Sequence, residues 1–84
     1  MKRFLVMAIR TPNFSDDVIA PHLAFLAELK NAGKLEMNGG FGDKSGGAYL
    51  LNVDSLAEAQ AIGAADPLAT SGASIVTVYE WNTH

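Results

Sequence analysis

One internal histidine is the residue of this chain whose type and placement most suggest chemistry. His22 lies in the run Pro21-His22-Leu23-Ala24-Phe25-Leu26, and the other histidine, His84, is the last residue of the sequence. Apolar residues recur around His22 at three- and four-residue spacing, which predicts that it lies on the core-facing stripe of a helix. A buried imidazole needs a hydrogen-bond partner. A carboxylate partner would fix the tautomer and leave the second ring nitrogen as a base.

Asp66 is the carboxylate that fits this role best. It follows an alanine-rich segment and precedes Pro67-Leu68, so it stands in an apolar setting at the end of a predicted helix. Two hypotheses stay open on the residues alone. In one, His22 and Asp66 form a proton-transfer pair. In the other, which spacing and composition favour, Asp66 only caps a turn and His22 is a core histidine with satisfied hydrogen bonds.

Other kinds of site find little support in the sequence. With two histidines and no cysteine, a metal site would need carboxylates from several elements, and no local spacing indicates one. We therefore expect no metal and no cofactor. The glycine-rich segment 39–47 has neither a Gly-x-Gly-x-x-Gly fingerprint between a strand and a helix nor a Gly-Lys-Ser/Thr motif. We interpret it as a flexible connection between two strands and as a candidate lid over a pocket. No serine lies in a Gly-x-Ser-x-Gly elbow.

Length and composition predict one small domain that forms a homodimer. The chain has 84 residues and a net charge of −3, and its charged share of 18% is below the usual ~25%, so apolar surface is left for association. Without cysteine there is no disulfide, and a dimer interface is the remaining way to add buried area.

Composition also argues against two classes of partner. Six scattered Lys and Arg residues make no basic patch for nucleic acid. No run reaches the ~20 apolar residues of a membrane span. The apolar run 4–9 is shorter than the roughly 7–15 residues of a signal-peptide core. We therefore expect a cytoplasmic protein that binds neither nucleic acid nor membrane.

The first half of the chain is predicted to form a strand and a helix. The segment 2–10 is apolar on both faces of a strand, so both faces should be covered. The helix that follows begins near Ala20 after a turn, or near Asp17 with a bend, because proline at Pro21 is tolerated only in a first turn. Gly33 is expected to end it.

The second half adds three strands and a helix. Strands are predicted over 34–38, 48–53 and 75–81, with loops over 39–47 and 68–72. Ser55 and Glu58 fit a capping box at the start of the second helix, and Asp66 ends it because it precedes a proline. The order βαββαβ is that of the ferredoxin-like α+β fold, a four-stranded antiparallel sheet with two helices on one face. A second copy of the chain would cover the other face.

The ordered set of short motifs resembles the YCII-related family of small α+β proteins, over about residues 3–81. The motifs are Pro21-His22-Leu23-Ala24-Phe25-Leu26, Leu29-x-x-x-Gly33-x-Leu35, Gly39-Gly40, Gly47-x-Tyr49, Ser55-x-x-Glu58-Ala59, Ala65-Asp66-Pro67-Leu68, Gly72 and Trp81. The resemblance implies a single YCII-like domain over 1–84, a ferredoxin-like fold and a dimeric α/β-barrel type of assembly. It also implies a His–Asp dyad beside a small pocket, formed here by His22 and Asp66. Departures from the family pattern at Phe41, Leu68 and Glu80 leave the pocket shape and substrate open.

With the resemblance, the sequence favours a small cofactor-independent enzyme of isomerase or lyase type. His22 would move a proton on a small organic substrate, and Asp66 would orient the ring and stabilise its cationic form. Arg10 would bind an anionic group, unless it is only a solvated strand end, and Gly40 and Trp81 would line the pocket. The alternative is a non-catalytic module for ligand binding or dimerisation, in which the His–Asp contact is structural. A second ring nitrogen that faces an open pocket would favour the enzyme.

Overall fold

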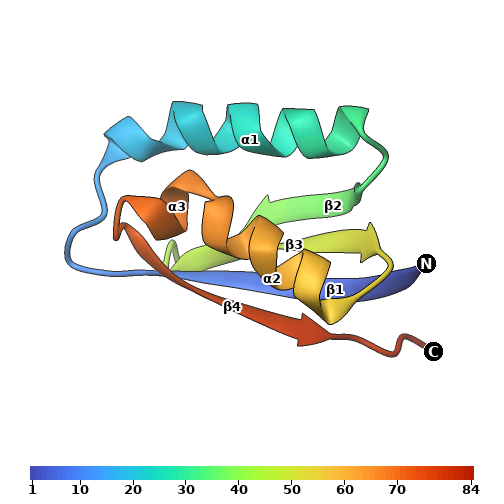
Figure 1. The fold of residues 1–84 in the computed structure, drawn as a ribbon. Helices are drawn as coiled ribbons and strands as arrows, with labels where there is room; N and C mark the ends of the chain where they lie inside the picture. Colours follow the sequence, from blue (N-terminus) through green and yellow to red (C-terminus); the bar gives the residue numbers. More distant parts are fainter.

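Four antiparallel strands form one sheet, which is covered on one face by helices (Figure 1). In the computed structural model, which describes residues 1–84, the strands are β1 (Lys2–Arg10), β2 (Leu35–Gly40), β3 (Gly46–Val53) and β4 (Ser74–Glu80). They lie in the order β2-β3-β1-β4. This arrangement is the ferredoxin-like α+β fold, which confirms the fold class predicted from the order of the elements.

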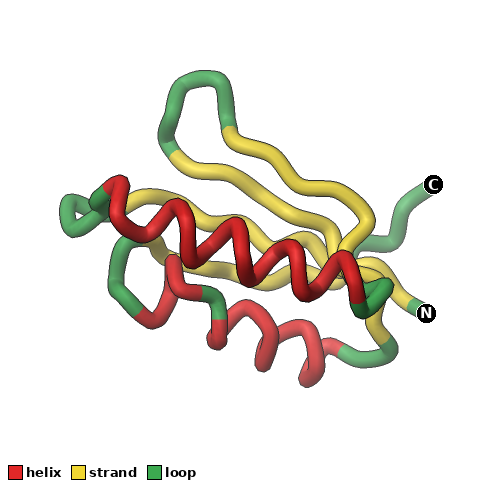
Figure 2. The backbone as a smooth tube through the Cα atoms, turned by 90° about the horizontal axis from the view of Figure 1, so that it is seen from above, coloured by secondary structure: helices red, strands yellow, loops and turns green.

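The two main helices, α1 (Ile19–Asn31) and α2 (Leu56–Ala65), lie side by side over the sheet (Figure 2). A short 3₁₀ turn, η1 (Asp16–Val18), precedes α1, and Ser15 caps it by accepting a hydrogen bond from the Asp17 N–H at 3.3 Å. Pro21 therefore lies in the first turn of α1, where its missing N–H costs no hydrogen bond. Of the two alternatives for the helix start, the first is confirmed. Gly33, with φ of 75°, follows the end of α1 as predicted.

Parts of two segments predicted as loops form regular structure. Gly39 and Gly40 continue β2 and pair with the beginning of β3, so the predicted glycine loop over 39–47 was wrong at both ends and is confined to 41–45. Glycine permits this close pairing, because a Cβ on Gly47 would lie 2.5 Å from the Gly39 carbonyl oxygen. The predicted loop 68–72 was also wrong in part, since α3 (Pro67–Thr70) is a short helix. Asp66 caps it by accepting from the Leu68 N–H, and proline suits its first position.

The start of α2 differs from the prediction in one detail. Ser55 caps the helix, because its hydroxyl accepts a hydrogen bond from the Glu58 N–H at 3.1 Å. The Glu58 carboxylate does not reach back to close the capping box and instead lies 3.1 Å from the Lys34 ammonium. The serine cap is therefore correct, while the reciprocal half of the box was wrong.

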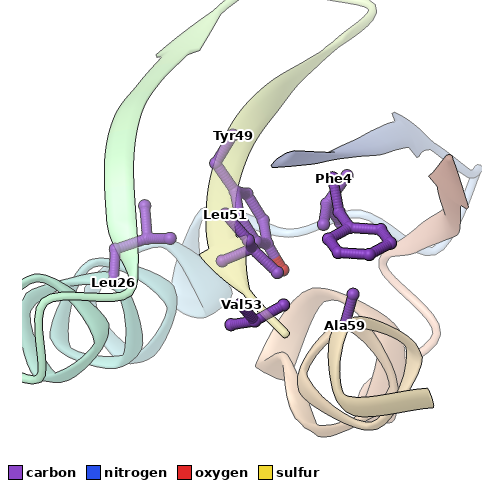
Figure 3. Packing of buried hydrophobic residues seen from close by; sticks show 7 residues of the cluster. Phe4, Leu26, Tyr49, Leu51, Val53 and Ala59 are labelled. Carbon is purple, nitrogen blue, oxygen red and sulfur yellow. The ribbon is translucent and has the colours of Figure 1, made fainter. Parts of the chain in front are cut away.

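The main hydrophobic core lies between the sheet and both helices. It consists of Phe4, Val6, Leu26, Tyr49, Leu51, Val53 and Ala59. Figure 3 shows Leu26 coming from α1 and Ala59 from α2, with the strand side chains between them. A second, smaller cluster of Ala8, Val18, Leu68 and Ala73 lies toward the other end of β1.

The opposite face of the sheet has no helix over it (Figure 1). Side chains alternate between the faces of a strand, and this face carries exposed apolar groups, including Ile9, Met37, Ile75 and Tyr79. The chain itself thus covers only one of the two apolar faces of β1. None of the helices combines the length and apolarity that crossing a membrane requires.

Candidate functional site

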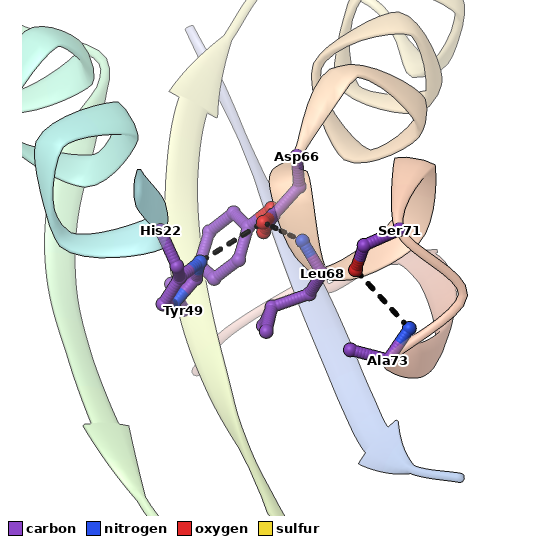
Figure 4. Close-up of polar contacts among 6 residues, drawn as sticks. All are labelled: His22, Tyr49, Asp66, Leu68, Ser71 and Ala73. Atoms are coloured by element: carbon purple, nitrogen blue, oxygen red, sulfur yellow. Dashed lines mark hydrogen bonds and ion pairs between the residues drawn. The ribbon is translucent and has the colours of Figure 1, made fainter. Parts of the chain in front are cut away.

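A fully buried carboxylate is the centre of the polar site. Asp66 follows the last residue of α2 and has 0% of its surface exposed. Its Oδ1 accepts hydrogen bonds from the His22 Nδ1 at 2.9 Å and the Leu68 N–H at 2.8 Å, and its Oδ2 accepts one from the Tyr49 hydroxyl at 2.8 Å (Figure 4). One side chain therefore ties together α1, β3 and the beginning of α3.

These donors decide the ionisation of Asp66. Burial by itself raises the pKa of the carboxyl, but the hydrogen bonds from His22, the Leu68 N–H and Tyr49 outweigh it and bring the pKa below its usual value. The pKa of Tyr49 is raised, first by burial and then by the negative charge of Asp66, so its hydroxyl stays protonated and donates. Asp66 is thus an ionised acceptor at neutral pH.

His22 is held by one nitrogen, and the other is free. Because Asp66 is an acceptor, Nδ1 carries the proton, so Nε2 of the neutral ring is the basic nitrogen. Nε2 makes no hydrogen bond within the protein. Because every fully buried side-chain nitrogen and oxygen has a hydrogen-bond partner, Nε2 is not fully buried. The side chain is 17% exposed and lines a cavity.

The predicted helical stripe around His22 is only partly buried. Leu26 is buried and Leu29 packs against the core, as expected. Leu23, in contrast, is 55% exposed, and Ile19 is exposed as well. Both line the cavity instead of packing into the core, because small residues of the sheet, among them Ala8, Gly40 and Gly47, leave space beneath them.

The cavity lies between α1 and the sheet and has a volume of about 220 Å³. Its sheet side is made of small residues of β1, β2 and β3, with Ala8, Gly40 and Gly47 among them. Its helix side is apolar except for His22. The polar groups that reach it are Arg10, His22, Asn38, Tyr49 and Ser74.

The structure brings four of the five residues singled out in the sequence to this place. Asp66 contacts His22 without lining the cavity itself, and Arg10 and Gly40 line the same cavity as His22. Trp81 does not: it follows β4 at the other end of the sheet, near the N-terminus, beside Arg3 and Asn52. The prediction that Trp81 lines the pocket of His22 was wrong within this chain, because β4 runs antiparallel to β1 and its end lies opposite Arg3.

Tyr49 is the functional side chain that sequence reasoning missed. It donates to the same carboxylate as His22, and the centre of its ring lies 6.1 Å from the centre of the imidazole ring. A signal was present, since a tyrosine in an otherwise apolar strand needs a partner for its hydroxyl. No group of three or more His, Cys, Asp or Glu side chains comes together in a way that could hold a metal ion.

Comparisons with known proteins agree with this architecture. The sequence model of the YCII-related domain matches residues 2–82. The uncharacterized protein YjpA of Bacillus subtilis (strain 168) is 44% identical over 81 residues, covering 96% of this chain and 95% of that protein. Among solved structures, 5-chloro-2-hydroxyhydroquinone dehydrochlorinase (TftG) from Burkholderia phenoliruptrix AC1100, in complex with 2,5-dihydroxybenzoquinone, is similar with a TM-score of 0.75 and 22% identity, over 98% of this chain and 95% of that one.

Proposed function

The chain belongs to the YCII-related domain family, and from this premise we propose that it is a small-molecule enzyme of isomerase or lyase type. In this proposal His22 is the general base. In an isomerisation the imidazolium returns the proton to the substrate as the general acid, and in an elimination it releases the proton to solvent. One observation carries the proposal: Nδ1 of His22 is held by Asp66 at 2.9 Å, while Nε2 has no partner in the protein and the ring lines a cavity.

The proposed step is the transfer of a proton from an activated C–H or O–H of the substrate to Nε2. The electron pair left on the substrate then either expels a leaving group, as in a lyase, or is reprotonated elsewhere, as in an isomerase. The ionised Asp66 stabilises the imidazolium that forms, because the two charges are in contact and the carboxylate is already oriented by Tyr49 and the Leu68 N–H. No cofactor takes part in this scheme.

The fold neighbour suggests the first compounds to try. Its name is that of a dehydrochlorinase, and it was solved with a dihydroxybenzoquinone. A panel of chlorinated and hydroxylated hydroquinones and of enolisable ring ketones therefore serves as the assay, with chloride release and solvent-deuterium incorporation as readouts.

The decisive variant is His22→Gln, which keeps a polar side chain of similar length and removes the base. A general base contributes about 10²–10⁴-fold, so turnover should fall by that factor while the fold and ligand affinity stay close to wild type. Ser45→Ala, in the hairpin turn, is a control that should leave turnover unchanged. Equal turnover by His22→Gln and the wild type would refute the role of His22.

A non-catalytic ligand-binding module is the alternative, and one observation favours it. Asp66 joins three elements through its hydrogen bonds, so the His22 contact also has structural value. If His22→Ala lowers stability and leaves every turnover and every ligand response of the wild type unchanged, the pair is structural and the alternative is correct.

For assembly we propose a homodimer through the uncovered sheet face. The apolar side chains there, with Ile75 66% and Met37 62% exposed, have no cover within one chain. Sheet-to-sheet packing of a second copy buries them by a two-fold axis. Light scattering should give twice the mass of the chain for the wild type. Ile75→Glu should shift it to the single mass, whereas Ala27→Glu, on the exposed side of α1, should not.

A further inference from the structure

The lining of the cavity has an unbalanced charge. Arg10 is the only Lys or Arg among its residues, and no Asp or Glu reaches it. The Asp66 carboxylate lies behind His22 and Tyr49, and its oxygens are occupied by three donors. In a protein with a net charge of −3, this is a local positive spot at a concave surface.

The Arg10 guanidinium also has no hydrogen-bond or ion-pair partner in the protein. Its guanidinium carbon lies 4.0 Å from the centre of the Phe14 ring, a cation–π contact that leaves the N–H groups unused. The side chain makes no ion pair and no hydrogen bond, whereas the backbone N–H of Arg10 donates to the Ser45 carbonyl. Its planar set of donors is therefore available to a ligand.

Arg3, at the other end of the same strand, shows what a structural arginine looks like here. Its guanidinium donates to Glu36 at 3.3 and 3.1 Å and to the Thr83 hydroxyl at 2.8 Å. The two arginines lie on one strand and differ in whether the protein supplies an acceptor. The protein supplies no acceptor for the Arg10 guanidinium, which lines the cavity.

The volume of the cavity limits the size of a ligand that could bind to Arg10. An apolar cavity of roughly 150 Å³ holds benzene, so about 220 Å³ holds one six-membered ring with substituents. Pockets for drug-sized ligands run from about 300 Å³ upward, which argues against a nucleotide. The apolar side chains of Ile19, Leu23 and Leu26 form the wall opposite the strands and suit the body of such a ring.

From these observations we propose that the cavity binds a small carboxylate of one-ring size, with the carboxylate on Arg10 and the apolar body against α1. The planar guanidinium fork matches the two oxygens of a carboxylate. The inference deepens the proposed function by naming the ligand class of the same cavity, but its test measures binding alone.

The test compares benzoate with benzamide, which has the same shape and no charge, by calorimetry and by NMR shift mapping on the full chain. A charge-assisted hydrogen bond at a partly exposed site should favour benzoate by about five- to tenfold. Shifts should map to Arg10, Gly40 and His22. Equal affinities, no detectable benzoate binding, or shifts confined to the Arg3 end would each overturn the inference.

Substitutions of Arg10 test whether this residue binds the carboxylate. Arg10→Met keeps the apolar stem and should lower benzoate affinity to that of benzamide. Arg10→Lys keeps the charge without the fork and should leave a smaller preference, which also guards against misfolding of the first variant. Arg3→Met is the matched control and should keep the full preference. A preference unchanged in Arg10→Met would overturn the proposal.

One further variant separates this inference from the proposed function. His22→Gln should keep the benzoate preference, because the anion is held by Arg10. If it keeps the preference and loses turnover, both proposals are supported. If Arg10→Met binds benzoate like the wild type while His22→Gln loses turnover, the ligand class fails and the proton-transfer role survives.

Discussion

The two ends of the helix-covered sheet face share one backbone pattern and differ in the size of their side chains. Between β1 and β3 the register pairs Phe4 with Leu51, Val6 with Tyr49 and Ala8 with Gly47. The first pair packs into the core, and the last pair borders the cavity. The cavity therefore arises because side-chain volume falls along the strands while α1 continues above them.

The difference shows which part of this small domain is tightly packed and which part is left open. At the Phe4 end both helices press on large side chains, while at the Ala8 end α1 faces glycine and alanine and leaves Leu23 half in solvent. The buried carboxylate of Asp66 lies between the two regions. Stability should thus depend on the packed end, and ligand binding on the open end.

The largest expected effect is in the packed end. Phe4→Ala should cost about 3–5 kcal/mol of unfolding free energy, because it empties a fully buried site. Leu23→Ala, at the cavity, should cost less than about 1 kcal/mol, because the side chain is largely solvated. Urea unfolding measures both. Equal losses would mean that the cavity end is packed as tightly as the core.

The second effect tests the boundary carboxylate. Asp66→Asn should cost about 2–3 kcal/mol at neutral pH, because an amide places a donor among three donors in a buried site. The pKa of Asp66 is lower in the folded than in the unfolded protein, so its contribution is complete above the unfolded value of about 4. That contribution is lost as the pH falls through the lower, folded value.

The pH dependence of unfolding measures this contribution. The wild type should lose stability below about pH 4 more steeply than Asp66→Asn does. Asp54→Asn, an exposed carboxyl without a hydrogen bond, should follow the wild type. Parallel wild-type and Asp66→Asn curves would mean that the ionised carboxylate stabilises nothing.

The sequence predicted the framework of this molecule well, for local physical reasons. The alternation in 2–10, the helical spacing after Pro21 and the Ser55 cap are local signals, and each corresponds to an element. Gly39 and Gly47 misled the prediction because glycine usually signals a turn, while their pairing depends on a partner strand. The local sequence pattern does not say which strand will pair with these glycines.

The candidate site was only half predictable. Spacing placed His22 on the covered face of a helix, but its contact with Asp66 spans 44 residues, and only the family resemblance favoured it. Tyr49 and the freedom of Arg10 depend on which strands are neighbours, which no local pattern records. Trp81 was assigned to the wrong end because its place follows from strand direction and not from residue type.

A pair of glycines sharpens the comparison at the open end. Gly47→Ala should cost about 1–3 kcal/mol, because its Cβ would lie 2.5 Å from the Gly39 carbonyl oxygen and the strands would have to separate. Gly40→Ala should stay within about 0.5 kcal/mol, because its Cβ meets only the Gly46 oxygen, at 3.8 Å. Both changes remove one glycine, so effects on the unfolded chain cancel. A large loss in Gly40→Ala would contradict an open cavity beside that residue.

The smallest effect concerns Tyr49, whose ring and hydroxyl serve different parts of the molecule. The Tyr49 ring is part of the main core, while its hydroxyl donates to Asp66. Tyr49→Phe keeps the ring and should cost about 1.5 kcal/mol, the low end for a hydrogen bond to a charged group, because two other donors to the buried carboxylate remain. With that donor gone, the pKa of Asp66 should rise, and acid unfolding should begin at higher pH than in the wild type. Tyr79→Phe removes a tyrosine hydroxyl that does not contact Asp66 and should leave the acid transition where it is in the wild type. An unshifted acid transition in Tyr49→Phe would place Tyr49 in the core alone and would leave His22 and Leu68 as the groups that keep Asp66 ionised.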